Sequence, residues 1–216
     1  MSTLTTDLLI SAYRQGVFPM AIDGQIYWYD PNPRAILPLD GFHMPRSLMR
    51  AAKRAVVETA AGSQRELITA EVRRSAKPGF LLTLDRDFRG VITACADPRR
   101  NGSWIDEQIL EAYVRLYHKG LAHSVETWQD GRLVGGLYGV SLNGLFAGEA
   151  MFSRATDASK VALVYLVQHL RQRGYALLDV QFQTEHLAQF GVIEIPRAQY
   201  RARLRQALQV QTTFAE

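Results

Sequence analysis

Apolar and polar residues alternate most clearly between residues 122 and 182. Three strand-like segments, AHSVETW, LVGGLYGV and LFAGEAMFS, are separated by the pairs Asp130-Gly131 and Asn143-Gly144. Such pairs favour the two-residue turns of β-hairpins, which need positive φ. The pattern then predicts a helix over 157–172 and a strand over 177–182. This order indicates an antiparallel three-stranded meander, a helix, and a strand that returns to the sheet.

Helical periodicity recurs elsewhere in the chain. In residues 87–96 the apolar side chains Phe88, Val91, Ile92 and Cys95 stand at positions i, i+3, i+4 and i+7, which predicts one buried helix face. Further helices are expected over 8–15, 105–119 and 198–209, and a short strand over 81–84. The polar segment 59–78 is expected to be helical with loose ends, as a linker or insertion.

Three prolines, Pro31, Pro33 and Pro38, interrupt residues 28–38. Because proline lacks a backbone donor, this segment is predicted to be a loop without a central strand or helix. The fold class is therefore α+β, with a small helical and loop-rich N-terminal part (1–58), the linker or insertion (59–78) and a larger C-terminal domain (79–216) with a mostly antiparallel sheet.

Composition narrows the class further. The 216 residues are 47% hydrophobic, enough for a core, and no stretch approaches the ~20 apolar residues of a membrane span. The N-terminus lacks the basic and apolar regions of a secretory signal. The single cysteine, Cys95, excludes an internal disulfide framework and favours a reducing compartment. We expect a cytoplasmic protein that does not bind membranes.

Positive charge is concentrated rather than large overall, with 25 Lys and Arg against 21 Asp and Glu. Arg46, Arg50, Lys53 and Arg54 recur at helical spacing after Pro45, so a helix there would carry them on one face. Such a stripe could contact phosphates. The alternative is an ordinary solvated helix face.

Two polar residues, Asp179 and Gln181, interrupt the apolar run LLDVQF, and alternation places them on one face of the strand. They are either part of a site, with the carboxylate orienting the amide, or a satisfied polar pair under a loop. Glu149 stands in the otherwise apolar strand LFAGEAMFS. It is either a pocket carboxylate or a solvent-facing residue.

Large apolar side chains could line a pocket: Trp28, Tyr29, Trp104, Phe146 and Met151. Packing in the core is the more common role for such residues. The five histidines and one cysteine show no metal-ligand spacing, so no metal site is expected. Cys95 stands on an apolar helix face, which favours a core residue over a nucleophile.

Six stretches together resemble the leucyl/phenylalanyl-tRNA–protein transferase family. They are AYRQGVFPM (12–20), WYDPNPRAILPL (28–39), FHMPRSL (42–48), SWIDEQILEAYVRLYHKGLAHSVETW (103–128), LVGGLYGVSLNGLFAGEAMFSRATDASK (133–160), and LLDVQF with EIPR (177–182 and 194–197). They occur in the family's order and span most of the chain. Departures include Ala150 in GEAMFS, Thr184-Glu185 after the D-x-Q strand, the polar segment 59–78, and a shorter N-terminal segment.

The resemblance implies a bacterial enzyme whose larger part has an acyl-CoA N-acetyltransferase-like fold. It implies transfer of Leu or Phe from charged tRNA to proteins beginning with Arg or Lys, which marks them for degradation, without cofactor or metal and as a monomer. Gln181 would contact the attacking amine and Asp179 would orient Gln181. Glu149 would bind the substrate amine, Leu137 would join the pocket for Leu or Phe, and the Arg46–Arg54 face would contact tRNA.

Two other functions are compatible with such a fold. The first is acetyl-CoA-dependent N-acetylation, but SRATDASK before the long helix has no glycine for a pyrophosphate loop. The second is a non-catalytic tRNA-binding adaptor, which the presence of Glu149, Asp179 and Gln181 disfavours.

Overall fold

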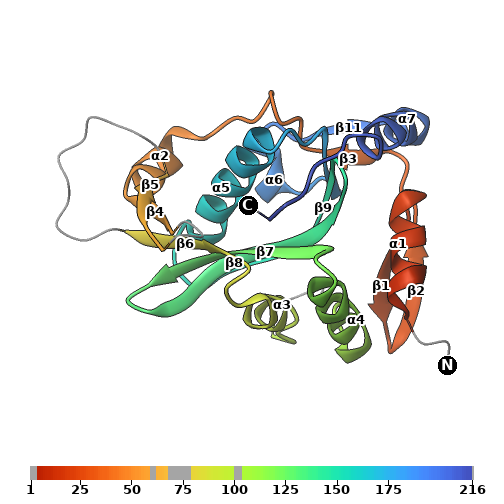
Figure 1. Ribbon diagram of the computed structural model, residues 1–216, viewed down its shortest axis with the longest axis horizontal. Helices are drawn as coiled ribbons and strands as arrows, with labels where there is room; N and C mark the ends of the chain where they lie inside the picture. Colours follow the sequence, from red (N-terminus) through yellow and green to blue (C-terminus); the bar gives the residue numbers. More distant parts are fainter. Residues whose placement is uncertain (1–3, 59–61, 68–78, 100–103, 216) are drawn as a thin grey trace.

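The structure is a computed structural model that describes residues 4–58, 62–67, 79–99 and 104–215. Within these residues a nine-stranded sheet has the order β11-β3-β10-β9-β8-β7-β6-β4-β5, and β1 and β2 form a separate hairpin (Figure 1). The strands are β1 (Phe18–Ile22), β2 (Gln25–Tyr29), β3 (Arg34–Ile36), β4 (Ala55–Glu58), β5 (Gln64–Glu66), β6 (Phe80–Leu84), β7 (Ala122–Gln129), β8 (Arg132–Leu142), β9 (Leu145–Ser153), β10 (Leu177–Gln181) and β11 (Ile193–Ile195).

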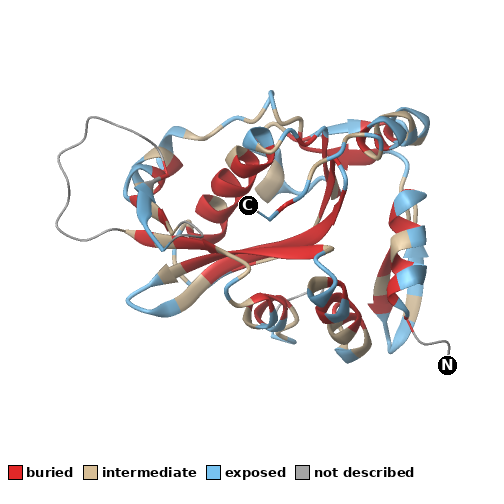
Figure 2. Ribbon diagram, in the orientation of Figure 1, coloured by how far each residue is buried: buried red, intermediate tan, exposed pale blue. Residues whose placement is uncertain are grey.

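Helices cover both faces of the large sheet. They are α1 (Thr6–Arg14), α2 (Arg46–Lys53), α3 (Phe88–Cys95), α4 (Glu107–His118), α5 (Ala158–Gln172), α6 (Glu185–Ala188) and α7 (Arg197–Ala207). Figure 1 shows α3 and α4 on one face and α5 on the other. Each face has its own apolar core, one built with α1, α3 and α4 and one with α2 and α5, and Figure 2 shows the strands between them as buried.

The predicted meander is confirmed. Strands β7, β8 and β9 pair antiparallel in sequence order, and the turn residues Asp130 and Asn143 have φ of 49° and 53°, as two-residue hairpin turns require. Helix α5 follows, and β10 then returns parallel to β9. The helices predicted over 87–96 and 105–119 are α3 and α4, and both begin at an aspartate cap, Asp87 and Asp106, that accepts a backbone N–H.

Residues 28–38 are not the predicted loop. Strand β3 lies inside the sheet, paired antiparallel with β10 on one side and with β11 on the other. The reason is local: the strand is only three residues long and lies between Pro33 and Pro38, so each of its residues keeps the N–H that the ladder needs.

The N-terminal part also contains more strand than expected. Strands β1 and β2 form a hairpin around Asp23-Gly24, whose φ values of 51° and 74° fit a tight turn. Strands β3 and β4 both lie within residues 1–58 and yet belong to the large sheet, so that sheet contains strands from both sides of the expected boundary at 58.

The polar segment 59–78 is described only over 62–67, where β5 pairs with β4. The prediction of a helix is wrong for these residues, because their backbone groups complete the edge of the sheet. The remainder of that segment lies outside the described residues.

Candidate active site

Strands β9 and β10 are neighbours for only part of their length. They pair over three positions, Leu145 with Leu177, Phe146 with Leu178 and Ala147 with Asp179. Strand β9 continues to Ser153 alongside β8 alone. Glu149 and Gln181 both lie just beyond the last pair, where the two strands part.

Glu149 is the extra residue of a β-bulge. Its neighbours Gly148 and Ala150 pair with Gly139 and Tyr138, and Glu149 has no opposite residue on β8. A bulge re-aims a side chain, and here the residue is only 8% exposed. Gly139 makes the bulge possible, because a Cβ there would lie 2.3 Å from the Ala147 carbonyl oxygen.

Three donors surround the Glu149 carboxyl group. The hydroxyl groups of Tyr13 and Tyr113 donate to it at 2.7 and 3.2 Å, and Gln181 Nε2 donates at 3.0 Å. The two tyrosine hydroxyls are also hydrogen-bonded to each other. Because each hydroxyl carries a single proton, the two protons are shared among Tyr13, Tyr113 and Glu149. Burial, together with a smaller effect of the Asp179 charge, outweighs the lowering effect of the bonds from Tyr13, Gln181 and Tyr113. The net result is that the pKa of Glu149 is raised to about 7. A carboxyl group that titrates near neutral pH can bind an amine or move a proton.

Gln181 is held in an unusual backbone conformation. Its φ is 66°, and the pairing of β10 with β3 shifts register between Asp179 and Gln181. Asp179 Oδ1 accepts a bond of 2.9 Å from the backbone N–H of Gln181. The side-chain amide donates to Glu149 instead. Asp179 therefore acts on the backbone of Gln181, and the expected contact with the amide side chain is replaced by the contact with Glu149.

Arg34 is a site residue that the sequence reasoning missed. It is 1% exposed, and its Nε and one terminal nitrogen donate to the two oxygens of Asp179 at 2.9 and 2.6 Å. The Tyr200 hydroxyl donates to Asp179 Oδ2 at 2.7 Å. A signal existed in the sequence. The lone acid in LLDVQF needs a cation if it is buried, and Arg34 lies in WYDPNPRAILPL, one of the stretches on which the resemblance rests.

The predicted pocket residues divide between the two faces of the sheet. Leu137, Phe146 and Met151 belong to the core on the α5 side, where Leu137 and Met151 are cross-strand partners. Tyr29 and Trp104 pack against the other core. Trp28 is 40% exposed. The structure thus places Leu137, Phe146 and Met151 in one core and Tyr29 and Trp104 in the other.

An aromatic cluster that the sequence reasoning did not foresee lies next to Gln181. The rings of Phe18, Tyr29 and Phe182 have centroids 5.7 to 6.5 Å apart. Phe182 directly follows Gln181 and is 41% exposed, so the cluster reaches the surface beside the site.

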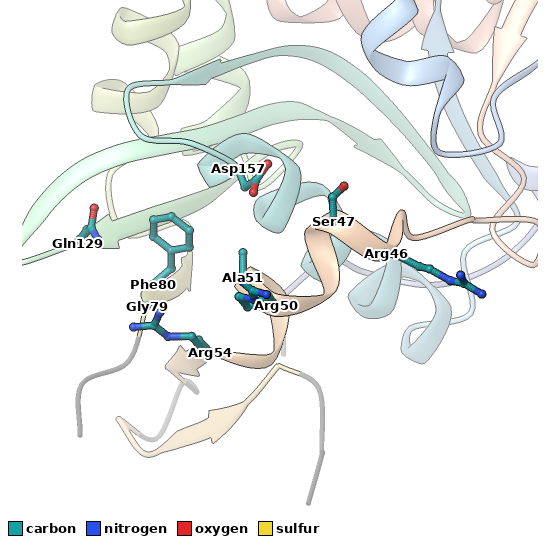
Figure 3. A pocket seen from close by; sticks show the side chains of 9 residues that line it. All are labelled: Arg46, Ser47, Arg50, Ala51, Arg54, Gly79, Phe80, Gln129 and Asp157. Atoms are coloured by element: carbon teal, nitrogen blue, oxygen red, sulfur yellow. The ribbon is translucent and has the colours of Figure 1, made fainter. Parts of the chain in front are cut away.

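The predicted basic helix is present as α2, with Leu48 and Ala52 buried and Arg46, Arg50, Lys53 and Arg54 exposed. Arg46, Arg50 and Arg54 line a pocket of about 550 Å³ (Figure 3). Its other walls come from the start of β6, the end of β7 and Asp157 before α5. Lys53 is not part of the lining.

The described part of the chain holds no group of three or more His, Cys, Asp or Glu placed to bind a metal ion. None of its helices combines the length and apolar character needed to cross a membrane. Cys95 is buried in the core of α3, as its place on an apolar face predicts.

Known proteins resemble this chain over its whole length. The family model described as leucyl/phenylalanyl-tRNA protein transferase matches residues 36–205, and the model of that family's N-terminal domain matches residues 2–32. The leucyl/phenylalanyl-tRNA–protein transferase of Herpetosiphon aurantiacus is 52% identical over 212 residues, 98% of each chain. That of Gloeobacter violaceus is 49% identical over 215 residues, again 98% of each.

Among solved structures, a ribosomal-protein-alanine N-acetyltransferase from Brucella melitensis biovar Abortus 2308 is 18% identical. The match covers 51% of this chain and 84% of that protein, with a TM-score of 0.36.

The fold and the candidate site define an α+β protein in which a buried glutamate and a glutamine side chain meet where two strands part. The sequence matches identify the family. The chain belongs to the leucyl/phenylalanyl-tRNA–protein transferase family, and it is an aminoacyltransferase that uses aminoacyl-tRNA.

Proposed function

We propose that this enzyme transfers Leu or Phe from charged tRNA to the α-amino group of proteins that begin with Arg or Lys, and so marks them for degradation. The observation that carries the proposal is the bond between Gln181 and a buried glutamate whose pKa lies near 7. We further propose that the enzyme acts as a monomer in the cytoplasm, in keeping with its single, buried cysteine.

The reaction is aminolysis of an ester. The amine nitrogen attacks the carbonyl carbon of the aminoacyl group, forms the new C–N bond and gives a tetrahedral oxyanion. Its collapse breaks the bond to the ribose oxygen of the tRNA, which leaves with the proton lost by the amine. The ester is already activated, so the enzyme has to align the two reactants, remove a proton and stabilise the oxyanion.

Gln181 and Glu149 are the residues we place at the reacting groups. The Gln181 amide donates to Glu149 through Nε2, so its Oε1 is the end that can accept a bond from the attacking amine. A neutral amide has too little proton affinity to act as a base, and we assign it a positioning role. Glu149 can bind the substrate amine as an ammonium ion, because its ionised and neutral forms are both populated near neutral pH.

We place the Leu or Phe side chain on the α5 side of the sheet, against Leu137, Phe146 and Met151. Leu137, Phe146 and Met151 belong to one apolar cluster, and Phe146 directly precedes Ala147, the last residue of β9 that pairs with β10. Such a cluster suits an unbranched or aromatic side chain. Tyr29 and Trp104 pack against the other core, which contains Tyr13 and Tyr113, and Trp28 is 40% exposed. We assign these three residues to the approach to the site.

We propose that α2 contacts the tRNA. Exposed arginines on one helix face and a basic pocket suit phosphate groups. Replacing Arg50 by Ala should weaken binding of charged tRNA about threefold and reduce the dependence of binding on salt. Arg14→Ala, which removes an exposed arginine of α1, is the matched control and should leave both quantities unchanged.

The reaction itself is tested with labelled Leu-tRNA and Phe-tRNA and with peptides that begin with Arg, Lys or Ala, with acetyl-CoA in parallel. We expect label on the Arg and Lys peptides alone. Transfer to the Ala peptide at the same rate would contradict the proposed acceptors. Acetylation, or binding of charged tRNA without transfer, would contradict the reaction.

A further inference from the structure

Arg34 connects two parts of the chain that both lead to Glu149. Its Nε and one terminal nitrogen bind Asp179, and its other terminal nitrogen donates to the carbonyl oxygen of Gly16 at 2.9 Å. The guanidinium group also lies over the rings of Phe18 and Tyr200, 4.7 and 4.4 Å from their centroids. Every face of this buried cation is therefore occupied.

The first connection runs to Gln181. Asp179, held by Arg34 and Tyr200, accepts the backbone N–H of Gln181. A non-glycine residue at φ 66° is in a strained conformation that persists only where the surrounding structure restrains it. The bond to Asp179 is such a restraint, and it determines where the Gln181 amide points.

The second connection runs to Tyr13. Gly16 ends the turn that follows α1, with φ of 82°, and the Tyr200 ring would lie 2.8 Å from a Cβ at that position. Tyr13 stands on the last turn of α1. By binding the Gly16 carbonyl, Arg34 holds the end of the helix that carries the Tyr13 hydroxyl.

We propose that Arg34, together with Tyr200, is a positioning residue that holds two of the hydrogen-bond donors of Glu149, Gln181 and Tyr13, in place for the transfer reaction. Gln181 is reached through Asp179 and Tyr13 through Gly16. The inference rests on the proposed function for its kinetic part only.

The geometry requires arginine. The planar guanidinium group binds both carboxylate oxygens of Asp179 and still has a nitrogen for Gly16, whereas a lysine ammonium group is a point charge without that fork. Arg34→Lys keeps the charge beside Asp179 and Glu149 and removes the simultaneous contacts. Tyr200→Phe is the milder change, since it removes one hydroxyl group and keeps the ring.

The kinetic test separates binding from the chemical step. We expect Arg34→Lys to lower kcat for transfer about tenfold or more, through misplacement of the reacting groups, and to leave KM for charged tRNA unchanged. Tyr200→Phe should have a smaller effect in the same direction. In a background of Gln181→Ala, Tyr200→Phe should cause no further loss, because the residue through which it acts is already absent.

A second readout needs no transfer activity. The bonds from Gln181 and Tyr13 lower the pKa of Glu149, so loosening these donors should raise it by about half a unit. The change is measured by carbon NMR of labelled glutamate side chains during a pH titration. The titratable groups around Glu149 are Asp179, Arg34, Tyr13, Tyr113 and Tyr138, and Arg34→Lys preserves the charge of each.

Tyr175→Phe is the matched control. It also removes a buried tyrosine hydroxyl, which bonds to Ser141 Oγ at 2.6 Å, and it should move neither kcat nor the Glu149 titration. If both Arg34→Lys and Tyr200→Phe fold and leave the titration as in the parent protein, the proposal is overturned. If Arg34→Lys does not fold, the Glu149 titration of Tyr200→Phe alone tests the proposal, and an unchanged titration overturns it. If the parent protein transfers nothing, the proposed function fails, and the titration still decides the positioning role.

Discussion

Glu149 and Glu126 are two buried glutamates of the same sheet, and burial raises the pKa of each to about 7. Glu126 lies in a regular part of β7, opposite Gly136 and Thr83. Its carboxyl group accepts bonds from the hydroxyls of Thr83 and Ser124, and from two backbone N–H groups at the start of α3 at 3.4 Å. Glu149 lies on a bulge, and its donors come from α1, α4 and β10.

The difference supports the role that we propose for Glu149 and not for Glu126. Both glutamates are buried and both titrate near neutral pH, so neither property distinguishes them. The partners of Glu126 are hydroxyls and backbone amides close to the start of α3, as in a structural cap. The partners of Glu149 are long side chains from distant elements, assembled where two strands part, and one of them belongs to a residue with φ of 66°. Assembly of this kind has a cost in stability that a structural role does not require.

The largest expected difference between the two acids is in activity. Replacing Glu149 by Gln should reduce transfer about a thousandfold, because the carboxylate that binds the amine is lost. Replacing Glu126 by Gln should leave transfer within about threefold. Single-turnover transfer from charged tRNA measures both, with circular dichroism to verify folding. Equal losses of transfer activity in the two variants would contradict the proposed difference in role between Glu149 and Glu126.

The second expected effect is on stability and is the same for both acids. The unfolded pKa is near 4.5 and the folded pKa about 7, so the folded protein binds more protons between these values, and stability falls as pH rises from 4.5 to 7. The change in pKa between the unfolded and the folded protein corresponds to about 3 kcal/mol in the free energy of unfolding for each acid.

Urea unfolding at pH 4.5 and pH 8 measures this linkage. Glutamine resembles the protonated acid, so Glu126→Gln and Glu149→Gln should each be more stable than the parent protein at pH 8 and similar to it at pH 4.5. A variant whose advantage does not depend on pH would show that its glutamate does not titrate in this range.

The smallest expected effect comes from removing one donor at each site. Tyr13→Phe and Ser124→Ala each remove one hydroxyl that bonds to a buried glutamate, and each should lower the free energy of unfolding by about 1 kcal/mol. Only Tyr13→Phe should also lower kcat, about fivefold. Thermal unfolding measures the stability of both variants, and initial rates of transfer measure their activity. A loss of activity in Ser124→Ala would indicate that Glu126 also contributes to the reaction.

Local signals explain which parts of the fold were predictable. The pairs Asp130-Gly131 and Asn143-Gly144 define the meander because positive φ is a property of a few residue types. Periodicity defines α3 and α4 because a helix repeats its own pattern. The same reasoning failed for β3, where prolines on both sides concealed a strand whose hydrogen bonds come from β10 and β11, far along the chain.

The sequence indicated several residues of the candidate site, Glu149, Asp179 and Gln181 among them, but not how they are arranged. Alternation left Glu149 undecided between solvent and pocket, because a bulge adds one residue and breaks the alternation. The apolar candidates looked alike in the sequence, yet Phe146 and Trp104 pack on opposite faces of the sheet. The sequence did not indicate a role for Arg34, because its partner Asp179 is adjacent only in the folded protein.

The sequence by itself determined the α+β class, the meander–helix–strand order, the family, and the residue types present at the site, since all of these depend on local turns, periodicity or motif. Only the tertiary structure decided that Gln181 contacts Glu149, that Asp179 binds Arg34, and that the pocket candidates divide between two faces. Arg34 and Asp179 are 145 residues apart. Such contacts depend on how sheet and helices pack, and buried charges and amides make them because an unpaired polar group in the core would be too costly.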